Sequence, residues 1–187
     1  MKTQGWWGSN TAYITLENVK VPKENLIGEE NKGFSYIMKN FNNERYTMCV
    51  SSVAMCHTLI RESVRYAAMR RTFDRPLIQH QVIRHKIAEM AMRSEALYAM
   101  CEQIAYHLKT ETPDLDLAPR IALCKAYSTK TLEYCAREAS QIFGGFSQQR
   151  TGQGSLVERI YRDVRVQAIG GGSEEIMMDL GIRMSKL

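Results

Sequence analysis

Apolar residues recur at helical spacing along most of the chain. From Phe34 to about Met69 they predict one long helix. The segment 70–76 ends it, because Pro76 lacks a backbone donor and disfavours helix just before it. The clearest stripe follows, in alternating steps of three and four residues that are typical of a helix packed in a bundle. Its members are Ile83, Ile87, Met90, Leu97, Cys101, Ile104 and Leu108.

Further helices are predicted in the last part of the chain. One starts near Pro119, which a first helical turn tolerates, and runs into the segment QIFGG. A short helix is predicted at 156–164 and a final one from Ser173 onward. Short loops between helices favour antiparallel neighbours. The expected fold is therefore all-α, an up-down four-helix bundle.

Residues 1–30 follow a different pattern. Apolar and polar residues alternate over 11–21, which predicts a half-buried strand that ends at Pro22. Trp6 and Trp7 indicate a turn with aromatic anchors just before it. One or two strands do not form a stable sheet by themselves. We therefore expect residues 1–30 to be the end of a mostly missing β domain, and residues 31–187 to form the helical domain.

Composition places the chain among soluble globular proteins. It has 187 residues, 44% hydrophobic and 24% charged, with no apolar run long enough to span a bilayer and no secretory signal pattern. The five cysteines have no CxxC spacing, which favours buried free thiols in a reducing compartment over disulfides or a metal site. The four histidines include no pair at i, i+4, which argues against zinc. The expected location is intracellular, in the mitochondrial matrix or cytoplasm.

The net charge of +5 is modest, and basic residues are interspersed with acidic ones. This pattern fits a groove for a phosphorylated cofactor, a nucleic-acid surface or a solvated helix face, of which the solvated face is favoured. Glu44 is open to two interpretations in the same way. It is a solvated glutamate or a general base, since a carboxylate among apolar groups is a better proton acceptor near neutral pH.

Two glycine clusters occur late in the chain, at Gly144–Gly145 and at 170–172. Glycine is costly inside a helix, so a run of three indicates either close approach of a ligand or a plain helix end and turn. Ser173, Glu174 and Glu175 follow the triplet like an acid-rich helix start, whose free N–H groups suit an anion or an electron-rich carbonyl.

An ordered set of short motifs resembles the C-terminal domain of acyl-CoA dehydrogenases, the flavoenzymes that oxidise acyl-CoA thioesters. Each motif is weak alone, but together they cover nearly the whole chain. They are VKVP and NLIG near the start, Gly33-Phe34, Asn43-Glu44-Arg45, the segment RRTFDRPL from Arg70, Gln81, QIFGG from Gln141, Tyr161-Arg162-Asp163 and SEEI from Ser173.

The resemblance implies a flavin adenine dinucleotide (FAD) site shared between subunits, with a neighbouring subunit's flavin held by the RxxF and QxxGG segments. The implied FAD contacts are Arg70, Thr72, Phe73, Gln81, Gln141, Gly144, Gly145 and Ser173, and no metal is implied. Phe41 and Arg45 would flank the acyl-CoA pocket. Arginine suits a pyrophosphate, and glycine allows close backbone approach.

The implied reaction is α,β-desaturation, in which a carboxylate takes the α-proton and a β-hydride passes to flavin. Most family members place the base in the last glycine turn, where this chain has Gly171. Long-chain and isovaleryl-type members place it at the position of Glu44, which is therefore the expected base, whereas Glu175 is not. Asp74 replaces a usual glycine. The missing N-terminal and β domains imply that this chain alone is inactive.

Partners implied by the resemblance are an acyl-CoA substrate, a homodimer or homotetramer through the bundle, and electron-transfer flavoprotein or a similar acceptor. An oxygen-using relative, such as an acyl-CoA or nitroalkane oxidase, is a second enzymatic hypothesis. A non-catalytic helical assembly or nucleic-acid-associated module is the alternative from another class. It would need a basic surface patch and steep salt dependence, and the dispersed charges speak against it.

Overall fold

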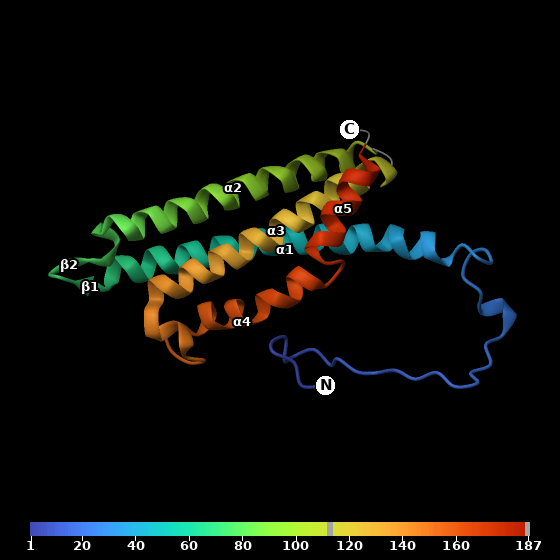
Figure 1. Ribbon diagram of the computed structural model, residues 1–187, viewed down its shortest axis with the longest axis horizontal. Coiled ribbons are helices and arrows are strands. Elements are labelled where there is room, and N and C mark those ends of the chain that lie inside the picture. The colour runs from blue at the N-terminus through green and yellow to red at the C-terminus, as the bar shows by residue number, and fades with distance from the viewer. Residues whose placement is uncertain (112–113, 186–187) are drawn as a thin grey trace.

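Three long helices lie side by side in the computed structural model, which describes residues 1–111 and 114–185 (Figure 1). They are α1 (Gly33–Met69), α2 (Gln81–Lys109) and α3 (Asp114–Phe143). Two shorter helices, α4 (Ser155–Ile169) and α5 (Glu174–Met184), complete the described α-helices. α3 is the central element, because it packs against each of the other four. The all-α bundle is confirmed, as three long helices and two short ones.

A small hairpin closes one end of the bundle. Its strands β1 (Arg71–Thr72) and β2 (Arg75–Pro76) pair antiparallel, with Arg71 opposite Pro76 and Thr72 opposite Arg75. A 3-10 turn, η2 (Leu77–Gln79), leads from it into α2, and another, η3 (Gly144–Gln148), follows α3 at the same end. A third, η1 (Lys23–Asn25), precedes α1.

Helix boundaries differ from the predicted ones at two places. α3 begins at Asp114, so Pro119 lies in its second turn rather than its first and removes one backbone hydrogen bond there. α4 continues to Ile169, beyond the predicted end at residue 164, and Gly170 caps it. In both α3 and α4 additional helical residues pack on neighbouring helices. Local sequence signals do not predict such tertiary packing.

The predicted strand at 11–21 is wrong for this chain. These residues form no ladder, and Tyr13, Ile14 and Leu16 are 88%, 84% and 78% exposed. A strand needs a neighbour to satisfy its backbone groups, and no described segment pairs with this one. The aromatic anchor is present: the Arg162 guanidinium lies 3.7 Å from the Trp7 ring centroid, and the Trp6 N–H donates to Asp163 at 2.8 Å. The division between residues 30 and 31 stays a prediction.

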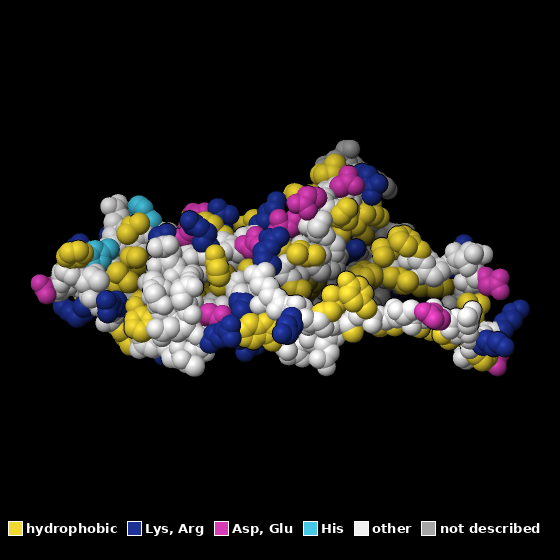
Figure 2. Space-filling model, turned by 60° about the horizontal axis from the view of Figure 1, so that its bottom comes forward, with side chains coloured by type: hydrophobic (Ala, Val, Ile, Leu, Met, Phe, Trp, Pro, Cys, Tyr) yellow, Lys and Arg dark blue, Asp and Glu magenta, His cyan; other side chains and the backbone are white. Residues whose placement is uncertain are grey.

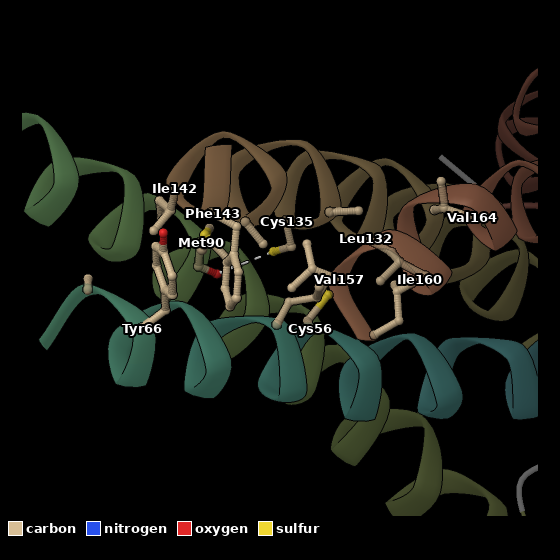
Figure 3. Close-up of a cluster of buried hydrophobic side chains, with 14 of the residues drawn as sticks. Cys56, Tyr66, Met90, Leu132, Cys135, Ile142, Phe143, Val157, Ile160 and Val164 are labelled. Atoms are coloured by element: carbon tan, nitrogen blue, oxygen red, sulfur yellow. Dashed lines mark hydrogen bonds between the residues drawn. The ribbon is translucent and has the colours of Figure 1, made fainter. Parts of the chain in front are cut away.

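The core fills the space between α1, α2, α3 and α4 (Figure 3). Most of the predicted α2 stripe is buried, whereas Leu108 is 38% exposed. All five cysteines are free and buried, as predicted. A hydrogen bond with Cys135 and burial together raise the pKa of the Cys56 thiol, so this thiol stays protonated and inert. Over the described ranges, no helix is both long and apolar enough to cross a membrane.

Candidate functional site

The predicted site residues separate into two groups along α1. One group surrounds the hairpin at the end of α1, and the other surrounds Arg45 and the glycine turn between α4 and α5. Met69 lies 24 residues beyond Arg45 on the same helix, which is about 36 Å at a rise of 1.5 Å per residue. A dinucleotide bound at one group therefore does not reach the other.

The hairpin group forms a pocket of about 490 Å³, here called the hairpin pocket. It brings together four of the predicted FAD contacts from three separate elements. Arg70 ends α1, Thr72 lies on β1, and Gly144 and Gly145 follow α3. The other lining residues are Tyr66, Leu77, Ile142, Phe143, Phe146 and Gln149. A guanidinium, a hydroxyl and exposed glycine backbone are the groups expected to receive a phosphorylated cofactor.

The geometry of the hairpin follows from its two-residue turn. Phe73 and Asp74 both have positive φ, 52° and 59°, as a tight hairpin turn of this type requires. Glycine adopts such a φ without strain, so it would suit the position of Asp74. The Thr72 hydroxyl lies 3.0 Å from His80 Nε2, which fixes the strand to the start of α2.

Three other predicted FAD contacts lie outside the hairpin pocket but at the same end of the bundle. Phe73 is 90% exposed at the tip of the turn, Gln81 is exposed as the first residue of α2, and Gln141 is exposed near the end of α3. None of the three side chains lines the hairpin pocket, and all three are exposed to solvent.

Sequence reasoning missed the aromatic wall of the hairpin pocket. The rings of Tyr66 and Phe143 stack with centroids 4.3 Å apart, and Phe146 meets Tyr66 edge-on at 6.3 Å. Their positions within or beside the RxxF and QxxGG segments are the sequence feature that could have predicted this wall. Their side chains read equally well as core packing from the sequence alone.

The second group surrounds the turn at 170–172, here called the glycine turn. Gly170 caps α4, and Gly171 and Gly172 have positive φ, 70° and 114°. The Arg45 Nε donates to the Gly171 carbonyl at 2.8 Å, and its guanidinium lies 5.7 Å from the Phe41 ring centroid. Ser173 caps α5 by accepting from the Ile176 N–H at 3.5 Å. Ser173 is thus placed far from the hairpin pocket.

A second cation, Lys125 on α3, holds the same turn. Its side chain is fully buried, and its Nζ donates to the Gly172 carbonyl at 2.6 Å and to the Ala168 carbonyl at 3.2 Å. Desolvation lowers the pKa of Lys125, and the nearby Glu174 carboxylate opposes that shift. Burial likewise lowers the pKa of Arg45. No sequence pattern distinguishes Lys125 from other helix lysines.

Glu44 immediately precedes Arg45 on α1. Its side chain is exposed in the described chain, so the apolar surroundings expected for a base are not supplied by these residues. Met48, four residues on and therefore on the same helix face, has its sulfur 3.1 Å from where a Gly171 Cβ would lie. Glu44 is thus one helical turn from a residue that touches the position of Gly171.

A groove of about 720 Å³ extends from Arg45 between α1 and α5 and is here called the α1–α5 groove. Figure 2 shows hydrophobic side chains exposed where α5 meets the N-terminal half of α1. Lys39, Arg45 and Arg183 lie among these apolar residues. Such a lining suits a ligand that has both an anionic group and an apolar chain. The lining residues are Phe34, Ser35, Met38, Lys39, Asn42, Arg45, Ala118, Leu180, Arg183 and Met184.

Comparison with known proteins decides the family. Residues 31–185 match the family model described as "Acyl-CoA dehydrogenase, C-terminal domain". The chain belongs to the acyl-CoA dehydrogenase family. Acyl-CoA dehydrogenase AFT10-1 of Alternaria alternata is 36% identical over 97% of this chain and 43% of its own length. A crystal structure of a probable acyl-CoA dehydrogenase from Mycobacterium abscessus superposes with a TM-score of 0.90 at 34% identity, over 98% of this chain and 47% of that one.

Two other solved structures of similar proteins contain ligands. One is a glutaryl-coenzyme A dehydrogenase in complex with glutaryl-CoA, with a TM-score of 0.89 and 26% identity over 97% of this chain and 45% of that one. The other, from Bacillus anthracis, is complexed with FAD, with a TM-score of 0.83 and 28% identity over 95% and 33%. This acyl-CoA dehydrogenase chain spans less than half the length of the relatives it matches.

Proposed function

We propose that this chain is the C-terminal domain of an FAD-dependent acyl-CoA dehydrogenase that desaturates acyl-CoA thioesters. The observation that carries the proposal is the separation of the predicted residues into two groups about 36 Å apart on one helix. Such a layout is expected if the glycine turn serves one active site and the hairpin pocket serves the flavin of a neighbouring subunit. Homo-oligomerisation, as a dimer or tetramer, is part of this proposal.

The hairpin pocket fits FAD by the chemistry of its donors. Arg70 and Thr72 would hold phosphate oxygens, and Gly144 and Gly145 leave open space, since a Cβ added at either would meet nothing within 4 Å. Phe73, Gln81 and Gln141 would meet the cofactor from the same end of the bundle. When bound, FAD supplies the hydride acceptor. A flavin of this kind passes electrons on to electron-transfer flavoprotein or a similar acceptor.

Glu44 is the proposed base, with a carboxylate oxygen that takes the α-proton of the thioester. Gly171 offers no side chain at the alternative position, and Glu44 lies one turn from Met48, which contacts that glycine. Phe41 and Arg45 would orient the acyl-CoA, whose anionic and apolar parts suit the α1–α5 groove. Ser173 would meet the ligand from the start of α5.

The test uses the full-length protein that carries this chain. Anaerobic titration with acyl-CoAs of graded length should bleach the flavin absorbance of the wild type. Glu44→Gln should bind FAD and acyl-CoA but reduce flavin at least about 1,000-fold more slowly, because it lacks the base. Glu62→Gln, the same change on the same helix about 27 Å away, is the matched control and should reduce normally. Near-normal reduction by Glu44→Gln would exclude Glu44 as the base.

A further inference from the structure

We propose that Lys125 is a positioning residue, which together with Arg45 fixes the backbone of the glycine turn against the part of α1 that carries Glu44. The inference rests on the proposed function, because the turn matters only if the active site lies beside it. It adds a residue from α3, the helix that also supplies Ile142 and Phe143 to the hairpin pocket.

The two cations together bind three carbonyls around the glycine turn. Lys125 Nζ donates to two carbonyls, those of Ala168 and Gly172, one on each side of Gly170–Gly171. Arg45 binds the carbonyl between them, that of Gly171. Ala168 belongs to the last turn of α4, where carbonyls lack helical partners and a cation is favourable. The turn is thus held at three points by side chains from two different helices.

Both cations are buried, which is energetically unfavourable in itself. Lys125 is 0% exposed and Arg45 is 7% exposed, and removing a cation from water is expensive unless it is well hydrogen-bonded. Apolar residues of similar volume often stabilise a fold equally well. Two desolvated cations at one turn therefore serve to fix its position rather than to raise overall stability.

The glycine turn is connected through Arg45 to the groove and to Glu44. Arg45 is adjacent to Glu44, lines the α1–α5 groove and also donates to Asn42 at 3.2 Å. Thr129, one turn after Lys125, donates to the Glu174 carboxylate at 2.8 Å and ties the start of α5 to α3. A shift of the glycine turn would therefore move Arg45, the groove and the start of α5 together. A displacement of about 1 Å in a reacting site costs on the order of 100-fold in rate.

The experiment compares Lys125→Met with Lys86→Met in the full-length flavoprotein. Lys86 on α2 is a matched control, because it pairs with the buried carboxylate of Glu138 but lies outside the glycine turn. Lys125→Met should keep its FAD content and lose about 10- to 100-fold in the rate of flavin reduction at saturating acyl-CoA. Lys86→Met should lower thermal stability and leave that rate within about twofold of wild type. Lys125→Gln keeps one donor group, so its rate of flavin reduction should lie between those of wild type and Lys125→Met. This variant replaces Lys125→Met if Lys125→Met does not fold.

Hydrogen exchange separates this inference from the proposed function. The backbone amides of residues 168–173 should exchange faster in Lys125→Met than in wild type. Their exchange rates should be the same in Lys86→Met as in wild type. Unchanged exchange there, wild-type reduction rates in Lys125→Met, or equal slowing in Lys86→Met would each overturn the positioning role while the dehydrogenase assignment stands. A wild-type flavin that no acyl-CoA reduces would overturn the proposed function, and this inference would fall with it.

Discussion

The two glycine-containing turns of this chain use glycine for different reasons. At Gly144 and Gly145 an added Cβ would meet nothing within 4 Å, so the space beside the backbone is open. At the glycine turn an added Cβ on Gly172 would lie 2.5 Å from Met177, and one on Gly171 would lie 3.1 Å from Met48. Glycine in the first turn leaves room for something outside this chain, whereas glycine in the second lets the chain pack on itself.

The same contrast holds for the cations at the two turns. Arg70 ends α1 as an exposed residue beside the hairpin pocket, with its side chain available to an anion. Lys125 is fully buried and already donates to two backbone carbonyls. A cation that holds a ligand and a cation that holds the protein are thus distinguished by burial and by partners, and not by residue type.

Among the effects that test this contrast, the largest is expected at the hairpin pocket. Arg70→Ala should weaken FAD binding about 10- to 100-fold, because charge-assisted hydrogen bonds to phosphate are lost, and should leave the unfolding midpoint of the apoprotein nearly unchanged. Isothermal titration of the full-length apoprotein measures the affinity. Arg71→Ala is the control, since the Arg71 guanidinium donates instead to the Asp74 carbonyl at 2.5 Å. Equal losses in both variants would contradict a specific role for Arg70.

The next largest effect is a difference in stability between substitutions in the glycine turn and at Gly144–Gly145. Gly172→Ala should lower the free energy of unfolding by about 2 kcal/mol, because φ is 114° and the new Cβ would collide with Met177. Gly145→Ala should change it by less than about 0.5 kcal/mol, because its φ is ordinary and its surroundings are open. Urea unfolding of the two variants gives both values. Comparable destabilisation would mean that the turns do not differ in the way described.

Sequence patterns predicted the bundle well because each long helix carries an apolar stripe that packing then buries. The α2 stripe is an example, since Ile83, Met90 and Leu97 are all buried as expected. Residues 11–21 show the limit of such reasoning. Their alternation is typical of a strand, but a strand forms only with a partner, and the described chain supplies none.

Sequence motifs identified residues that the fold brings together where those motifs mark backbone geometry. Arg70, Thr72 and Gly144 come together in one pocket because the RxxF and QxxGG segments end two neighbouring helices. Lys125 could not be found in this way. Its role depends on which carbonyls lie opposite it across the bundle, and that contact spans 47 residues of sequence.

The smallest effect is expected at Ser173. Substitutions there test whether this residue contacts a ligand or stabilises the fold. If its main role is to cap α5, Ser173→Ala should cost about 0.5–1 kcal/mol of stability, at the low end because the bond to the Ile176 N–H is 3.5 Å long. Ser173→Asn, another good capping residue, should restore that stability. FAD affinity and the rate of flavin reduction, measured alongside, should then be unchanged in both variants. If both variants lose FAD affinity while Ser173→Asn is as stable as wild type, Ser173 contacts the cofactor, and the glycine turn also serves a ligand directly.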